Sequence, residues 1–180
     1  MTSQQNLVIE PGRTVVVIMD FQVGIVSAAA RNPQATLENA VAVLDAARTV
    51  GIAVIYIQHR GGRFEVDTPE AEFHPAITPR PGERVFQKLR AGSFSTTGLD
   101  VLLREAGRDT LVLMGIATSG CVLSTVRWGA DVNYRLVVIK DACDDPDEEV
   151  HRVLTEKLFP RQANVLTTEQ FVNGAYNLLG

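Results

Sequence analysis

A cysteine that could act as a nucleophile follows a turn of small residues in the middle of the chain. Cys121 comes directly after Gly-Ile-Ala-Thr-Ser-Gly (115–120) and begins a helical pattern. In the first turn of a helix its thiolate would face unpaired backbone N–H groups and the positive end of the helix dipole, which lower a thiol pKa. The same N–H groups could bind an oxyanion. We therefore interpret Cys121 as a candidate nucleophile; the alternative is a small buried apolar residue on a helix.

Two charged residues end strand patterns elsewhere in the chain. Asp20 closes the β-branched run RTVVVIMD, and Lys88 closes the short segment RVFQK. A carboxylate in this position could be a general base or could orient one, although carboxylates also end strands simply because a loop begins there. The lysine could stabilise a thiolate and a neighbouring carboxylate; the alternative is a solvated lysine on an edge strand. Only proximity to Cys121 would give the two residues a role in catalysis.

Strand and helix patterns alternate along the chain and predict how these residues meet. Strand patterns cover residues 13–20, 51–58, 84–88, 109–114 and 135–141, with a last short strand around Val165. Helical patterns cover residues 36–50, 97–106, 121–132, 144–158 and 168–179. Such alternation implies right-handed crossovers and a parallel sheet that is covered on both faces. We predict an α/β fold of one domain over residues 1–180, with three layers (αβα) and a six-stranded, mainly parallel sheet.

The expected strand order places the candidate residues at one crevice. For six strands the common doubly wound order is 3-2-1-4-5-6, in which ligands bind where the carboxyl ends of the first and fourth strands diverge. Asp20 ends the first strand, and Cys121 begins the helix after the fourth. We therefore expect these two side chains to approach one another from distant parts of the sequence.

Composition excludes several classes of function. The chain is 46% apolar and 21% charged, and no apolar run approaches the ~20 residues of a membrane helix. The net charge is −4 and the 17 basic residues are scattered, which argues against a nucleic-acid partner. The start, MTSQQNLVIEPG, lacks the features of a signal peptide. We expect a cytoplasmic protein that acts on a small molecule, with Cys121 and Cys143 as free thiols.

Three segments in order resemble the signature blocks of isochorismatase-like cysteine hydrolases, a family that includes nicotinamidases and N-carbamoylsarcosine amidases. The segments are VVVIMDFQVGIV, VFQKLRAGSFSTTGLDVLL and LVLMGIATSGCVLSTVRWGADVNYRLVVIKDAC. The resemblance runs from about residue 13 to 170. It implies a catalytic triad of Asp20, Lys88 and Cys121, in which the aspartate takes the thiol proton and later gives it to the leaving amine. The family's usual assembly also implies a homodimer or homotetramer.

The same resemblance implies the geometry of an oxyanion hole. It places a cis peptide between Ile116 and Ala117, and it assigns the backbone N–H groups of Ala117 and Cys121 to the developing oxyanion. The implied reaction is attack of the thiolate on a carbonyl, release of ammonia or an amine from a thioester, and hydrolysis of that thioester.

One departure from the family bears on metal binding. Nicotinamidase-like members carry metal-binding Asp and His residues shortly after the second strand, where this chain has Gln-His-Arg-Gly-Gly (58–62). Asp67, Glu70, Glu72 and His74 follow in a polar segment, which is typical of a solvated acidic loop. We therefore predict no metal and no cofactor, and we do not expect nicotinamide as the substrate.

Four residues are candidates for substrate binding: Gln22, Arg60, Phe94 and Thr118. Arg60 could hold a substrate carboxylate through paired N–H donors, but it could equally be a solvated loop arginine. Phe94 could line the pocket, although core packing is the usual role of such a residue. The turn that holds Thr118 looks more like that of the carbamoyl amidases, whose substrates are small ureido or carbamoyl compounds.

The residues thus favour one hypothesis over two others. The favoured one is a cysteine-dependent hydrolase of a small amide or carbamoyl C–N bond. The second is vinyl-ether hydrolysis of the isochorismatase type, which uses the aspartate as an acid and needs no cysteine. The third is a catalytically silent scaffold of the same fold, which has no physical reason to keep Asp20, Lys88 and Cys121 together.

Overall fold

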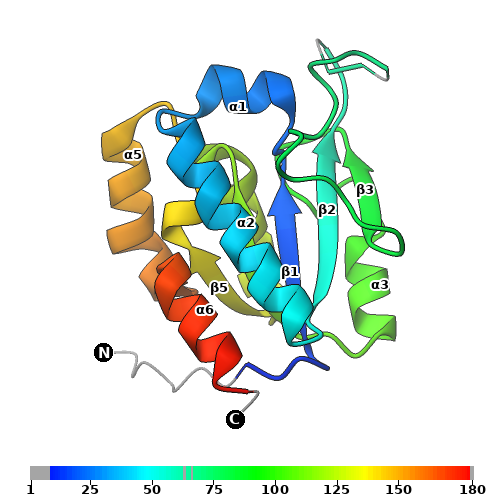
Figure 1. The fold of residues 1–180 in the computed structure, drawn as a ribbon, viewed down its shortest axis with the longest axis vertical. Coiled ribbons are helices and arrows are strands. Elements are labelled where there is room, and N and C mark those ends of the chain that lie inside the picture. The colour runs from blue at the N-terminus through cyan, green and yellow to red at the C-terminus, as the bar shows by residue number, and fades with distance from the viewer. Residues whose placement is uncertain (1–8, 63, 66, 179–180) are drawn as a thin grey trace.

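A six-stranded parallel sheet forms the centre of the molecule in the computed structural model (Figure 1). The structure describes residues 9–62, 64–65 and 67–178, so the predicted end of the last helix at Leu179 lies outside it. The strand order is β3-β2-β1-β4-β5-β6, which confirms the predicted order and the single αβα domain. The strands are β1 (Thr14–Met19), β2 (Ala53–His59), β3 (Arg84–Lys88), β4 (Thr110–Gly115), β5 (Arg135–Ile139) and β6 (Asn164–Leu166).

The central strands are buried on both faces, as their unbroken apolar runs predict. Every residue of β1 and of β4 is buried. The two strands pair in parallel register from Thr14 with Thr110 to Met19 with Gly115. Their carboxyl ends therefore stop side by side, and the chain leaves them in different directions.

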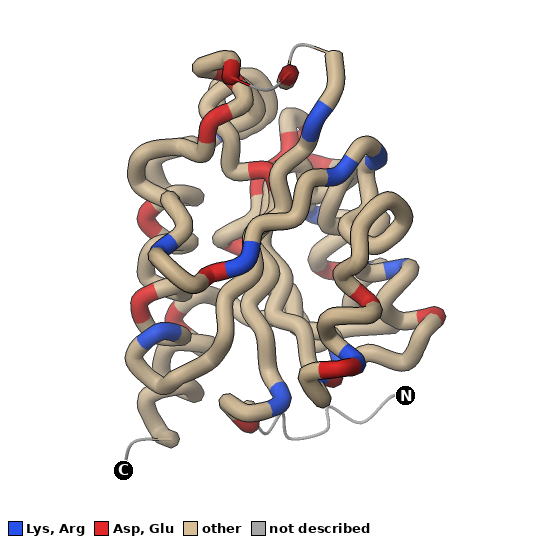
Figure 2. Tube along the Cα trace, turned by 90° about the vertical axis from the view of Figure 1, so that its right-hand side faces the viewer, with Lys and Arg blue, Asp and Glu red and all other residues tan. Residues whose placement is uncertain are grey.

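Helices cover both faces of this sheet, which Figure 2 shows from the side. In Figure 1, α2 (Pro33–Thr49) and α6 (Thr168–Tyr176) lie in front of the strands and contact each other. The helix α4 (Leu123–Asp131) packs on β5. The remaining α-helices are α1 (Val23–Ala29), α3 (Leu99–Glu105) and α5 (Glu148–Val153).

The helix α1 was not predicted, α2 begins three residues before the expected position, and two helices near the end of the sheet differ in their bounds. The helix predicted from Cys121 begins earlier, with the π-helical turn η1 (Thr118–Val122), and continues as α4. The helix predicted for 144–158 begins only at Glu148, where the Asp147 carboxylate accepts the N–H groups of Glu149 and Val150. It ends in a second π-helical turn, η3 (Leu154–Leu158). Two further one-turn segments adjoin strands: η2 (Lys140–Ala142) follows β5, and η4 (Phe159–Arg161) precedes β6.

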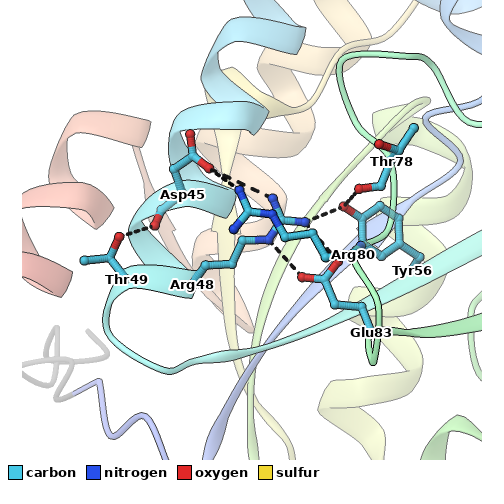
Figure 3. A network of polar contacts seen from close by, with 7 residues as sticks. All are labelled: Asp45, Arg48, Thr49, Tyr56, Thr78, Arg80 and Glu83. Carbon is cyan, nitrogen blue, oxygen red and sulfur yellow. Dashed lines mark hydrogen bonds and ion pairs between the residues drawn. The ribbon is translucent and has the colours of Figure 1, made fainter.

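The long segment between β2 and β3 is fixed at both of its ends. Near β2 it forms an isolated antiparallel bridge between Gln22 and Phe73. Near β3, Glu83 accepts hydrogen bonds from Arg48 at 2.8 and 2.9 Å, and Arg48 also donates to the Tyr56 hydroxyl at 3.1 Å (Figure 3). These contacts join the end of α2 and the middle of β2 to the returning loop, so that β3 aligns with β2.

Basic and acidic residues are interspersed along the trace in Figure 2. Among the residues described, no helix combines the length and the apolar character needed to cross a membrane.

Candidate active site

The three predicted catalytic residues meet at the carboxyl end of the sheet. Asp20 follows β1, Lys88 is the last residue of β3, and Cys121 lies in η1 after β4. Although β2 separates β1 from β3, the long lysine side chain reaches across it: Nζ lies 2.7 Å from the Asp20 Oδ2 atom. The crossovers of the fold thus assemble the cluster that the sequence predicts.

Lys88 is held in place by one carboxylate and two carbonyl groups. Besides the ion pair with Asp20, its ammonium donates hydrogen bonds to the carbonyl oxygens of Arg90 at 3.2 Å and Ala91 at 2.8 Å. Its side chain is only 1% exposed, so the charge is tolerated because all of these partners face it. The alternative of a solvated edge-strand lysine is therefore wrong.

Asp20 has one carboxylate oxygen that is engaged and one that is free. Oδ2 faces Lys88, whereas the buried Oδ1 has no hydrogen-bond partner among the described residues. The backbone of Asp20 has a φ of 60°, in the left-handed region that few residues other than glycine adopt. Such conformations cluster at functional sites, where the surrounding structure enforces them. Oδ1 is thus a buried acceptor that is available to take a proton.

Cys121 lies against the end of β4, where only a glycine leaves it room. Its thiol is buried and donates to the carbonyl oxygen of Ala117 at 3.6 Å. A Cβ atom on Gly115 would come within 3.0 Å of Cys121 Sγ and within 2.8 Å of the Met19 carbonyl oxygen. Gly115 therefore permits the turn that holds Cys121 to pack on the sheet.

Burial dominates the proton affinities of this cluster. Loss of hydration raises the pKa of Asp20 to about 6, although the charge and the hydrogen bond of Lys88 oppose the rise. Burial and the negative charge of Asp20 raise the pKa of the Cys121 thiol well above its ordinary value, while Lys88 lowers it. The prediction of a lowered thiol pKa is therefore wrong, because burial and the charge of Asp20 outweigh the effect of Lys88.

The turn between β4 and α4 holds the two backbone N–H groups that the resemblance assigns to an oxyanion. The Ile116–Ala117 peptide is cis, as the resemblance implies. Within the described chain, Ala117 N–H makes no hydrogen bond, and Cys121 N–H makes none outside its own helical turn. The neighbouring N–H groups all have acceptors: those of Ile116, Thr118, Ser119, Gly120 and Val122. Of the assigned pair, the Ala117 N–H is thus free among the described residues, and the oxyanion hole stays a prediction.

Two of the predicted substrate contacts are instead structural. Gln22 is fully buried, and its amide bonds to the backbone of His59 and Ala71. Thr118 is also fully buried, and its hydroxyl contacts the Asp144 carbonyl oxygen at 3.1 Å and His151 Nδ1 at 2.8 Å. Neither side chain has a free polar atom for a substrate, so these two predictions are not supported.

The other two candidates differ from each other. Phe94 is 5% exposed and stacks on Tyr134, with 5.6 Å between ring centroids, and on Trp128. Phe94 is therefore part of the packed core, which is the alternative to a role in lining the pocket. Arg60 is half-buried, donates its backbone N–H to the Lys88 carbonyl oxygen and lies against the Gln87 side-chain amide. It is therefore close to the cluster and remains a candidate for substrate binding.

A second layer of polar residues behind the turn was missed in the sequence. Asp144 and Asp145 are buried and bond to Thr118 and Ser119, and His151 reaches Thr118 from α5. The run Asp-Asp-Pro is typical of a helix start, which hid its other role. The signal that could have found it is two adjacent acidic residues directly after a buried strand.

No group of three or more His, Cys, Asp or Glu residues that could hold a metal ion occurs within the described part of the chain. His74, one of the possible ligands in the sequence, accepts a hydrogen bond from the Ala76 N–H at its Nδ1 atom.

Comparisons with known proteins identify the family of the chain. A family model described as the isochorismatase domain matches residues 14–170. The chain is 34% identical to streptothricin hydrolase of Streptomyces noursei over 69% of its own length and 47% of that protein. It is 30% identical to maleamate amidohydrolase of Pseudomonas putida, over 62% of its length and 53% of that protein. The matches thus span about half of each of these relatives.

The fold is also that of solved structures. A cysteine hydrolase from Pseudomonas syringae pv. phaseolicola superposes with a TM-score of 0.86, covers 96% of both chains and is 23% identical in sequence. At this identity the likeness concerns the fold alone.

Proposed function

Because the chain belongs to the isochorismatase family and is a hydrolase of that family, we propose that it cleaves a small amide or carbamoyl C–N bond through a Cys121 thioester. The observation that carries the proposal is the arrangement of four groups. A buried thiol, a carboxylate with one free oxygen and the N–H groups of Ala117 and Cys121 lie at the carboxyl ends of β1 and β4. Lys88 holds the carboxylate from behind.

The first half of the reaction forms the thioester. Asp20 Oδ1 takes the thiol proton as sulfur attacks the substrate carbonyl carbon, which suits a thiol that does not ionise alone. The carbonyl oxygen becomes an oxyanion, which the N–H groups of Ala117 and Cys121 stabilise. Asp20 then gives its proton to the leaving nitrogen, the C–N bond breaks, and ammonia or an amine departs.

The second half restores the enzyme. Water attacks the thioester carbonyl carbon while Asp20 takes one of its protons. The carbon–sulfur bond breaks, the proton returns to sulfur, and a carboxylic or carbamic acid leaves. Throughout, the ammonium of Lys88 keeps one carboxylate oxygen engaged, so that the same oxygen exchanges the proton in each step.

Ammonia release from a panel of small primary amides and carbamoyl compounds tests this proposal. The wild type is compared with Cys121→Ala and with Cys143→Ala, which removes the other buried free thiol. We expect release that is lost in Cys121→Ala and retained in Cys143→Ala. Release that is equal in all three proteins would overturn the cysteine mechanism.

Vinyl-ether hydrolysis is the alternative chemistry, and the raised pKa of Asp20 would suit its acid. That reaction gives no role to the thiol or to the N–H groups of Ala117 and Cys121, which is why we favour the amidase. The same three proteins separate the two reactions, because hydrolysis of a vinyl ether would survive in Cys121→Ala.

A further inference from the structure

The turn that leads to Cys121 packs on a second segment, and together the two extend the sheet beyond β4 and β5. Ile116 and Asp144 form an isolated parallel bridge, and the Asp144 carbonyl oxygen accepts the Thr118 N–H at 2.8 Å. The Asp144 carboxylate is itself anchored, since Oδ2 accepts the Asn32 N–H at 2.8 Å. The start of α2 thereby fixes the segment on which the turn lies.

The side chain of the next residue, Asp145, binds the middle of the turn through hydrogen bonds. Its Oδ2 atom accepts the Ser119 N–H at 2.7 Å, and Oδ1 accepts the Asp147 N–H at 3.2 Å. The residue is 2% exposed. Burial of a carboxylate is costly unless hydrogen bonds offset it, and bonds to an ionised acceptor are stronger than neutral ones. An acidic residue in this position therefore gives the turn a firmer hold than a neutral acceptor would.

The backbone of the turn shows what this hold accomplishes. Ser119 lies between Ala117 and Cys121, the two residues whose N–H groups would bind the oxyanion. The Ser119 N–H belongs to the Thr118–Ser119 peptide, so its bond to Asp145 fixes the orientation of that peptide plane in the middle of the turn. The Asp145 carboxylate accepts hydrogen bonds from the N–H groups of Ser119 and Asp147 and, within the described chain, from no atom of Cys121, so we expect its effect on the site to be one of orientation.

We propose that Asp145 is a positioning residue for the oxyanion hole: its buried carboxylate holds Ser119 so that the N–H groups of Ala117 and Cys121 converge on the substrate oxygen. This inference rests on the proposed function, because an oxyanion forms only if Cys121 attacks a carbonyl. It adds a residue that touches neither the substrate nor the catalytic triad.

Two small probes separate orientation from thiol reactivity. Acylation of Cys121 by p-nitrophenyl acetate passes through a tetrahedral oxyanion, whereas alkylation by iodoacetamide does not. Both reactions require the ionised sulfur and a folded site. The rate of each is measured for the wild type, Asp145→Ala and Asp145→Asn, with Asp147→Ala as the matched control. Asp147 is an acidic residue two positions further on, and its side chain caps α5 instead.

We expect Asp145→Ala to slow acylation by roughly tenfold or more, since loss of one oxyanion donor typically costs about 10²–10³ in rate. Alkylation should stay within about twofold of the wild type, which also shows that the variant is folded. Asp145→Asn, whose amide oxygen can still accept the Ser119 N–H, should recover most of the acylation rate. Asp147→Ala should leave both rates unchanged.

The outcomes distinguish this inference from the proposed function. If acylation is equally fast in Asp145→Ala and the wild type, or if both reactions slow by the same factor, Asp145 does not position the hole. If acylation of the wild type does not depend on Cys121, as judged from Cys121→Ala, the proposed function fails and this inference fails with it.

Discussion

The buried carboxylate of Asp20 should make the protein less stable as pH rises through the mildly acidic range. Its pKa is about 6 in the folded protein, against an ordinary value of 3.8. The folded state therefore binds this proton more tightly than the unfolded state does, and stability is greatest below the unfolded pKa. It is lost as pH rises through the folded pKa. Each tenfold change in proton affinity is worth about 1.4 kcal/mol, so the full effect is about 3 kcal/mol.

Urea unfolding of the wild type and of Asp20→Asn across the range pH 4 to 8 isolates this group, because all other titrating residues are shared. The stability of the wild type relative to the variant should fall by about 2 kcal/mol between pH 4 and pH 6, and by less than about 1 kcal/mol above pH 6. A difference that is independent of pH, or that grows in favour of the wild type as pH rises, would refute the account of a desolvated carboxylate.

Three further results are expected. The value of kcat/KM for the amide identified in the panel should rise with pH through about 6, because Asp20 must be ionised to take the thiol proton; a pH profile that is flat there would contradict its role as base. Lys88→Met should lower the free energy of unfolding, measured in urea at neutral pH, by about 3–5 kcal/mol, because it leaves a buried carboxylate unpaired. A loss below about 1 kcal/mol would show that the pair is solvated. Gly115→Ala should cost about 1–3 kcal/mol and reduce activity, because its Cβ would collide with Cys121 and the end of β1; a fully active, equally stable variant would contradict the close approach.

The fold and the meeting of Asp20 with Cys121 could be predicted from the sequence because both follow from strong local signals. Unbroken apolar runs predict buried parallel strands, and the strand order then determines which strand ends meet. Asp20 and Cys121 stand directly at such ends. The approach of these two residues thus follows from sequence position and topology, whereas the inclusion of Lys88 came from the family resemblance.

What could not be predicted depends on burial and on contacts between distant segments. The pKa of Cys121 depends first on burial, and burial becomes visible only when the packing around the sulfur is known. Gln22 appears beside Asp20 in sequence, but its amide is directed into the backbone of β2 and the following loop. Asp145 resembled part of a helix start, whereas it bonds to a turn 26 positions away.

The assembly of the protein into a homodimer or homotetramer and its location in the cytoplasm stay predictions. Light scattering of the purified protein at micromolar concentration would test the first.

Detection of an acyl group on Cys121 tests the central claim most directly. The wild type is mixed with p-nitrophenyl acetate, quenched in acid within the burst and digested with trypsin, which separates Cys121 in the peptide 109–127 from Cys143 in the peptide 141–152. We expect the acetyl group on the first peptide, released by neutral hydroxylamine as a thioester would be, and absent in Cys121→Ser under the same treatment. Turnover that continues with no acyl group on Cys121 would contradict the thioester mechanism.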